Sequence, residues 1–228
     1  GESSIIIGVN GDIDAEQGGV SLEATNGDIV VTEKVHAVTG LKAATKGQGG
    51  ISFGTDVEVS GDIGLTTEDG NITIGKRVYS TDGSILIEAA TKGEAAEKGD
   101  ISIGFTGSDS VDAVSAYKDV TLTTGLGKVL IDGGTTTMTG DIDSKKGSVS
   151  LEATRGDIVV TDRIHAEKSL NAATIDKGNI SFERAVSVSG DVNLKTETGD
   201  ITVGHRIQSS DGNINVTVGK GDIKVTDE

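Results

Sequence analysis

One six-residue phrase, Gly-Asp-Ile-Val-Val-Thr at residues 27–32, returns unchanged at residues 156–161. When residues 11–83 are aligned with residues 140–212 at a constant offset of 129, about 43 of the 73 positions are identical and no gap is needed. The chain therefore contains a tandem duplication. A sequence that repeats at a fixed period is expected to coil into a solenoid, because each repeat buries its apolar face against the next.

A finer period of 21 or 22 residues runs inside each copy. The coils of the first copy are residues 19–39, 40–61 and 62–83, and those of the second are 148–168, 169–190 and 191–212. Residues 3–18 end an earlier coil, and residues 213–228 begin a further one. Residues 84–147 form an irregular middle section between the copies.

Each coil holds three short segments in which apolar residues alternate with polar ones, as in strands with one buried face. In the first coil we expect the inward residues to be Val20, Leu22, Ala24, Ile29, Val31, Val35 and Ala37. Equivalent residues of successive coils should stack in columns. One column would hold Leu22, Leu65, Ile87, Leu122, Leu151 and Leu194, and another Ile29, Ile51, Ile72, Ile101, Val129, Ile158, Ile180, Ile201 and Ile223.

The pattern predicts an all-β fold, a parallel β-helix of about ten rungs, where a rung is one coil of three short strands. Residues 1–228 would form a single domain. The complete absence of Pro agrees, since an interior strand must donate its N–H to a neighbour. Aromatic residues make up only 2% of the chain and Trp is absent, which suits a narrow core of aliphatic side chains. An antiparallel barrel is the main alternative, but it needs tight Asn-Gly hairpins, and here the order is Gly-Asp or Gly-Asn.

Charge and cysteine content exclude several classes of partner. The net charge of −16 argues against nucleic acid, whose phosphates require cations, and favours solubility or cation binding. Without Cys there is no disulfide framework and no thiolate metal site. No apolar run approaches the roughly 18 residues of a membrane span, so we expect no membrane insertion.

Three insertions interrupt the rhythm of the middle section, at residues 92–98, 105–110 and 132–138. Solenoids accept insertions at their turns, where such loops often build a binding face. The residues in and beside these insertions that we predict to contact a partner are Glu94, Glu97, Phe105, Asp109, Asp112 and Thr136. Neutral surface loops at the junction of two duplicated units are the simpler interpretation.

A column of turn residues precedes the second strand of each rung, and it consists of Asp28, Gly50, Asn71, Asp100, Lys128, Asp157, Asn179, Asp200 and Asp222. Stacked carboxylates repel one another, and the interleaved Gly, Asn and Lys relieve that repulsion without a metal. Asp and Asn also suit turns, because their side chains bond nearby backbone groups. We therefore favour a turn role over calcium binding. The sequence lacks both the glycine-rich nonapeptide of calcium β-rolls and an EF-hand loop.

Catalytic signals are sparse. His36 and His165 occupy equivalent outward positions, and three scattered His without Cys make transition-metal chemistry improbable. Paired carboxylates serve β-helical enzymes that cleave polysaccharides, but such grooves usually contain aromatic residues. Here only Phe105, Tyr79 and Tyr117 are candidates, since Phe53 and Phe182 should point inward. We predict a non-catalytic protein that needs no cofactor.

The outward face of the second strand is unusually poor in charge, and its residues are Val30, Thr32, Ser52, Gly54, Thr73, Gly75, Ser102, Gly104, Val159, Thr161, Ser181, Thr202 and Gly204. Such a face could pack laterally on a partner. Ice binding would need more regular Thr, and an ordinary solvent-facing β-surface is the simplest interpretation.

The Gly-[Asp/Asn]-Ile-x-[Val/Ile] turns, the Ser-Leu-Glu-Ala-Thr strands, the rungs of about 21 residues and the lack of Cys resemble the repeat region of filamentous haemagglutinin-like adhesins. These are exported by two-partner secretion in Gram-negative bacteria. The likeness spans essentially the whole chain. Neither the family's amino-terminal secretion domain nor an Asn-Pro-Asn-Gly-type motif is present. Short Gly-Asp-Ile repeat proteins of bacteria look similar as well.

The resemblance implies a right-handed, extracellular β-helix that acts as an internal stalk segment and displays adhesive regions. The chain begins at Gly1 without Met, which suits a segment of a larger protein. The implied partners are a host-cell or bacterial surface receptor or glycan, and an outer-membrane transporter during export. The alternatives are a polysaccharide-binding or polysaccharide-cleaving β-helix and a calcium-stabilised surface rod.

Overall fold

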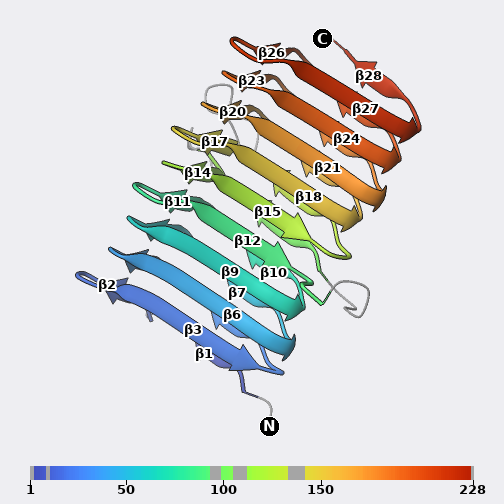
Figure 1. The fold of residues 1–228 in the computed structure, drawn as a ribbon. Coiled ribbons are helices and arrows are strands. Elements are labelled where there is room, and N and C mark those ends of the chain that lie inside the picture. The colour runs from blue at the N-terminus through green and yellow to red at the C-terminus, as the bar shows by residue number, and fades with distance from the viewer. Residues whose placement is uncertain (1–2, 9–10, 93–98, 105–111, 133–141, 227–228) are drawn as a thin grey trace.

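The structure is a computed structural model that describes residues 3–8, 11–92, 99–104, 112–132 and 142–226. Within these residues the chain forms strands and no helix, and it winds into the stack of rungs shown in Figure 1. The N-terminal rungs (blue) lie at one end of the stack and the C-terminal rungs (red) at the other.

Three sheets run along the stack, and each rung gives one strand to each sheet. Sheet A contains β3 (Gly19–Thr25), β6 (Gly40–Gln48), β9 (Asp62–Asp69), β12 (Ile85–Ala89), β15 (Val120–Thr124), β18 (Val149–Arg155), β21 (Leu170–Lys177), β24 (Val192–Thr198) and β27 (Ile214–Lys220). Sheet B contains β1 (Ile5–Ile7), β4 (Ile29–Val31), β7 (Ile51–Phe53), β10 (Ile72–Ile74), β13 (Ile101–Gly104), β16 (Val129–Asp132), β19 (Ile158–Val160), β22 (Ile180–Phe182), β25 (Ile201–Val203) and β28 (Ile223–Val225). Sheet C contains β2 (Ile13–Ala15), β5 (Val35–Ala37), β8 (Val57–Val59), β11 (Val78–Ser80), β14 (Val114–Ala116), β17 (Ile142–Ser144), β20 (Ile164–Ala166), β23 (Val186–Val188) and β26 (Ile207–Ser209).

Every strand pairs in parallel with its equivalent in the next rung, which confirms the predicted parallel β-helix. For example, Ile29 is paired with Ile51, which is paired with Ile72. The described residues form sheets of ten, nine and nine strands, or about nine complete turns. The alternative of an antiparallel barrel is wrong, because all ladders between these strands are parallel.

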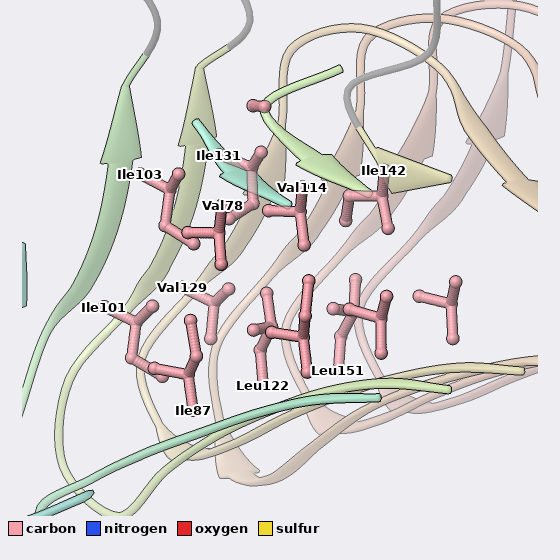
Figure 2. Packing of buried hydrophobic residues seen from close by; sticks show 14 of the residues in the cluster. Val78, Ile87, Ile101, Ile103, Val114, Leu122, Val129, Ile131, Ile142 and Leu151 are labelled. Carbon is pink, nitrogen blue, oxygen red and sulfur yellow. The ribbon is translucent and has the colours of Figure 1, made fainter. Parts of the chain in front are cut away.

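The core is a set of aliphatic columns inside the stack, and Figure 2 shows part of it around Ile101, Val129 and Leu122. Ile29 and Val31 are fully buried, and the strand pairing aligns the predicted Ile29 column, whose last member, Ile223, is exposed at the end of the stack. It also aligns the predicted Leu22 column, in which Ala43 and Ala172 fill the two rungs that the prediction omitted. Phe53 and Phe182 point inward as expected. Val20 and Leu22 are only partly buried, since they belong to one of the first rungs.

The irregular middle section does not break the core. Strands β12 to β17 carry the columns straight through it, with Ile85 paired to Val120 and Val120 to Val149. The irregularity of residues 84–147 is therefore one of loop length between strands that keep their register. Most of the inserted residues lie outside the described part of the chain.

The corner between sheets A and B requires glycine. Gly49 has a φ of +152°, and a Cβ placed on it would run into the backbone carbonyl of Gly27 in the preceding rung. Gly178 is its equivalent in the second copy, with a φ of +153° and the same clash with Gly156. Close stacking of successive corners thus explains why these positions are glycine.

Candidate functional site

Asp112 is the one predicted contact residue that the structure describes. Glu94, Glu97, Phe105, Asp109 and Thr136 lie outside the described residues, so their predicted roles stay predictions. Asp112 lies just before β14, at the corner between sheets B and C, and it is partly buried. It therefore marks the place where the insertion before β14 joins the regular rungs.

Burial raises the pKa of Asp112 to about 7, and the nearby carboxylate of Asp143 adds to that rise. The nearby side chains of Lys145, His165 and Arg77 oppose it. An acid shifted this far is protonated for part of the time at neutral pH, so it can donate as well as accept a hydrogen bond.

The neighbours of Asp112 lie on the outward face of sheet C. His165 Nδ1 and Asp143 Oδ1 are 2.8 Å apart, in a pair that joins β20 to β17. The guanidinium carbon of Arg77 lies 5.1 Å from the centre of the Tyr79 ring, and Lys145 Nζ lies 5.5 Å from it. We call Arg77, Tyr79, Asp112, Asp143, Lys145 and His165 the sheet C cluster.

Tyr79 is on β11, and Lys145, which directly follows β17, belongs to the second rung beyond it, so the contact between the two spans β14. It is in the outward row next to Ser115, which is only 3% exposed. The cluster thus combines an aromatic ring, two cations, two carboxyl groups and an imidazole. Sequence reasoning treated His165 as an inherited surface residue and named Tyr79 only as a candidate. The spacing of 22 residues between Asp143 and His165, one rung, was the available signal.

The turn column behaves as a structural ladder. The Asp28 side chain accepts a hydrogen bond from the N–H of Gly50 at 2.7 Å, and Asp157 accepts one from Asn179 at the same distance. Four further bonds have the same form. The backbone N–H groups of Asp100, Lys128, Asp200 and Asp222 donate to the side-chain oxygens of Asn71, Asp100, Asn179 and Asp200, respectively. Each side chain binds the backbone one rung ahead, which confirms the predicted turn role.

Among the described residues no group of three or more His, Asp or Glu side chains could hold a metal ion.

A second ladder of the same kind was not predicted. At the start of sheet A, Asp62 accepts from the N–H of Ser84, Asp119 from Ser148 and Asp191 from Asn213, all within 2.7–2.8 Å. The Gly-Asp pairs at 61–62 and 190–191 were its visible trace in the sequence.

Open grooves follow the corner between sheets A and B, and the two copies carry equivalent ones. The groove of the first copy has a volume of about 510 Å³, and its side chains are Asn26, Asp28, Gln48, Asp69 and Asn71. That of the second copy has about 470 Å³ and is lined by Arg155, Asp157, Lys177, Asn179 and Thr198. The first groove offers amides and carboxylates, which match the hydroxyl groups of a sugar. The second carries two cations, of which Arg155 pairs with Asp176 at 2.9 Å.

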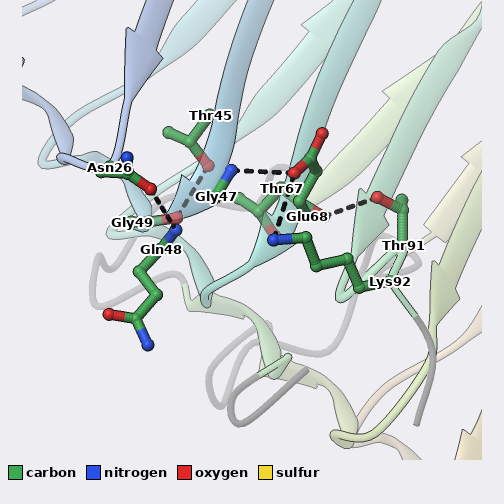
Figure 3. A network of polar contacts seen from close by, with 9 residues as sticks. All are labelled: Asn26, Thr45, Gly47, Gln48, Gly49, Thr67, Glu68, Thr91 and Lys92. Carbon is green, nitrogen blue, oxygen red and sulfur yellow. Dashed lines mark hydrogen bonds and ion pairs between the residues drawn. The ribbon is translucent and has the colours of Figure 1, made fainter. Parts of the chain in front are cut away.

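A polar network holds the wall of the first groove (Figure 3). The Gly47 N–H donates to Glu68 Oε2 at 2.8 Å, and Lys92 Nζ lies 3.4 Å from the same oxygen. The hydrogen bond from Gly47 lowers the pKa of Glu68, and Lys92 adds to this shift. The Gln48 N–H donates to the Asn26 side chain at 3.4 Å. The groove is therefore a built surface whose corner loops are tied to one another across rungs.

None of the described residues forms a helix long and apolar enough to cross a membrane. Comparisons of the chain with models of known protein families, with curated proteins and with solved structures found no match.

Proposed function

We propose that this chain is a rigid, extended segment that displays adhesive surfaces outside a bacterial cell and has no catalytic activity. The observation that carries the proposal is the continuous parallel pairing of the three sheets from β1 to β28. A stack of parallel rungs bears load along its length through hydrogen bonds between rungs and leaves its outer faces free to vary.

The extracellular location, a host-cell or bacterial surface receptor or glycan as partner, and export through an outer-membrane transporter belong to the same proposal. They rest on the resemblance of the Gly-Asp-Ile repeats to those of secreted adhesins. The sheet C cluster supports an adhesive role, because Tyr and Arg, here Tyr79 and Arg77, are enriched at contact surfaces.

A binding assay with matched variants tests the adhesive part. Beads coated with the chain are expected to bind cultured host cells or bacterial cells, and Tyr79→Gln should reduce that binding severalfold. This change introduces the residue of the equivalent position, Gln208, so the rung should still fold. Lys42→Asn, which likewise introduces the residue of the second copy, Asn171, is the control on the outward face of sheet A, away from the cluster. Beads that bind no better than uncoated ones would contradict the proposal.

Polysaccharide binding is the second candidate, and the amide- and carboxylate-lined groove of the first copy favours it. A glycan array tests this candidate, with Gln48→Lys as the variant because Lys177 stands at the equivalent position. Cleavage would require the carboxyl pair of Asp112 and Asp143 to act as acid and base. Incubation of array-positive polysaccharides with the protein, followed by product analysis, separates cleavage from binding, and under our proposal no shorter products appear.

A further inference from the structure

Two cations of the sheet C cluster meet at one aromatic ring. Tyr79 is the central residue of β11, Arg77 directly precedes that strand, and Lys145 follows β17, two rungs further along the stack. The guanidinium carbon of Arg77 and Nζ of Lys145 both lie within 5.5 Å of the ring centre. Because a cation is attracted to the face of an aromatic ring, Tyr79 holds the two positive charges at one place.

Neither of the two cations has an ion pair of its own. Among the described residues no carboxylate forms a salt bridge with Arg77 or Lys145. Glu58, which is paired with Tyr79 across β8 and β11, forms its salt bridge with Lys34 instead, at 3.0 Å. Lys145 is exposed and Arg77 is half-buried, so a ligand can approach both from solvent. Two such cations side by side suit an anionic group.

This arrangement occurs only where the two copies of the duplicated unit meet. Gln208 stands at the position of Tyr79 in the second copy, and Glu16 stands at the position of Lys145 in the first. Strand β14 of the middle section lies between the ring and the ammonium group, and its outward residue there is the small, buried Ser115. The site is therefore a product of the junction, since neither copy alone carries both groups.

Hydrogen-bonding groups lie beside the two cations. Asp143 and His165 form their pair at 2.8 Å on β17 and β20, and Asp112 lies at the corner before β14. Carboxyl oxygens accept hydrogen bonds, and an imidazole has a second ring nitrogen that donates or accepts. A sugar that carries a carboxylate complements both sets of groups, because its carboxylate pairs with the cations and its hydroxyl groups bond with the others.

The charge of the whole chain restricts the kind of acid that suits the site. With a net charge of −16, the protein repels a polyanion such as a nucleic acid or a densely sulfated polysaccharide. A ligand with a single carboxylate avoids most of that repulsion. An acidic peptide also supplies a carboxylate, but it brings few hydroxyl groups for Asp112, Asp143 and His165.

We propose that the sheet C cluster binds an acidic sugar of a surface glycan, an inference that rests on the proposed adhesive function and names its ligand. Arg77 and Lys145 are the counter-ions of the sugar carboxylate. Asp112, Asp143 and His165 bond with its hydroxyl groups. Tyr79 is a positioning residue that keeps the two cations together.

Asp112 makes the site sensitive to pH. Burial and the Asp143 carboxylate raise the pKa of Asp112 to about 7, so its carboxyl group gains a proton between about pH 8 and pH 6. The other charged or titratable groups around it are Lys145, His165 and Arg77. Loss of a negative charge beside the two cations strengthens their attraction for a carboxylate, so the sugar should bind more tightly as the pH falls.

A matched pair of sugars tests the ligand. Methyl β-glucuronide carries a carboxylate where methyl β-glucoside carries a hydroxymethyl group, and the whole chain is titrated with each while the NMR signals of Tyr79 and His165 are followed. We expect a dissociation constant of roughly millimolar size for the glucuronide, because the ligand is small and the site is open. The glucoside should bind at least roughly fivefold more weakly. Equal affinities would overturn the site, and acetate that binds as tightly as the glucuronide would overturn the choice of a sugar.

Two lysine variants locate the binding. Lys145→Gln and Lys42→Gln each remove one exposed ammonium group, the first from the cluster and the second from the outward face of sheet A. Lys145→Gln should weaken glucuronide binding at least roughly threefold, whereas Lys42→Gln should leave it unchanged. Equal losses would show a response to the net charge of the chain and would overturn the site. Circular dichroism should show the same sheet signal for both variants.

Asp112→Asn tests the pH dependence. The wild type should bind the glucuronide roughly twofold to threefold more tightly at pH 6 than at pH 8, and the variant should lose most of that difference. A variant that keeps all of it would overturn the role of Asp112.

The titrations need no cells, so they separate the sugar site from the adhesive function. Cell binding by a chain that does not bind the glucuronide would refute the sugar site alone. Glucuronide binding by a chain that binds no cells would refute the adhesive function alone.

Discussion

The two copies of the duplicated unit differ in a way that separates what the fold needs from what it allows. Inward residues such as Phe53 and Phe182 are identical, and so are the corner glycines Gly49 and Gly178. The side chains of the corner grooves have changed, from Asn26 to Arg155 for example. The same backbone corner therefore presents a neutral-to-acidic groove in one copy and a partly cationic groove in the other.

This contrast shows that some positions of a rung accept few residue types, whereas others accept many. The core columns keep side chains of similar size, with exchanges such as Val35 to Ile164 and Ile63 to Val192, and Gly49 is kept as Gly178, because a larger change there meets the next rung. Some groove residues have changed their charge between the copies, as from Asn26 to Arg155, whereas Asp28 and Asp157, which accept backbone hydrogen bonds from the next rung, are both Asp. A copy of this unit can thus change the charge of its corner groove while its fold is preserved.

The largest expected effect concerns the inward positions and tests whether the copies are energetically equal. Phe182→Ala should lower the free energy of unfolding by about 4 kcal/mol, because the side chain is fully buried and leaves a cavity. Phe53→Ala should cost about the same. Urea denaturation measures both. A difference above about 2 kcal/mol would show that the copies do not share one core environment.

A glycine pair sharpens the distinction between fixed and free positions. Gly178→Ala should cost about 3 kcal/mol, since its φ of +153° disfavours a side chain and the Cβ meets the Gly156 carbonyl. Gly64→Asn should be neutral within about 0.5 kcal/mol, because a Cβ there meets nothing within 4 Å and Asn193 already stands at the equivalent position. Thermal unfolding of both variants provides the measurement. Similar losses of stability in the two variants would contradict the distinction between constrained and tolerant positions.

Asp112 lies in the section between the two copies, and its ionisation should make the stability of the protein depend on pH. Its folded-state pKa, about 7, lies above its ordinary value of 3.8. The folded state therefore holds a proton that the unfolded state releases, and stability falls as pH rises from about 4 to 7. Above pH 7 the loss is complete.

Asp112→Asn removes this titration. It should stabilise the protein at pH 8 by about 2 kcal/mol, an amount reduced for the partial exposure of the carboxyl group. The gain should disappear near pH 4. Asp14→Asn, in the regular first copy, is the control. Thermal unfolding at the two pH values measures both variants, and an equal gain of Asp112→Asn at pH 4 and pH 8 would disprove the assignment.

The fold was predictable because the residues of the core columns recur at a regular interval in the sequence. Ile29, Ile51 and Ile72 recur at the rung period, and each is confirmed as buried and paired. The alternation within each strand likewise identified the outward residues of sheet B. A solenoid repeats its geometry, so one correctly read rung fixes the others.

The candidate sites were less predictable, because they depend on side chains from different rungs. Asp112 was selected for its place beside an insertion, but its pKa shift depends on burial and on Asp143, one rung away. The second ladder escaped notice, since its members Asp62, Asp119 and Asp191 alternate with Gly and Ser in the sequence. To predict a contact between two rungs, one must know which residues are paired across the strands. Insertions of unequal length hide that pairing in the sequence.

The smallest effect concerns the turn column and decides between a hydrogen-bonded ladder and a calcium site. Asp157→Ala should cost about 1 kcal/mol, because the Asn179 N–H loses its acceptor but stays near solvent. Asp157→Asn should cost almost nothing, since Asn71 and Asn179 already accept the same bond in their own rungs. A calcium site predicts that Asp157→Asn is costly as well, because replacing a charged ligand by a neutral amide would weaken metal binding. Melting curves of the wild type and both variants, recorded with calcium and with chelator, should therefore coincide between the two conditions. A melting temperature that rises with calcium in the wild type and not in Asp157→Asn would show that the carboxylates hold a cation in addition to the backbone.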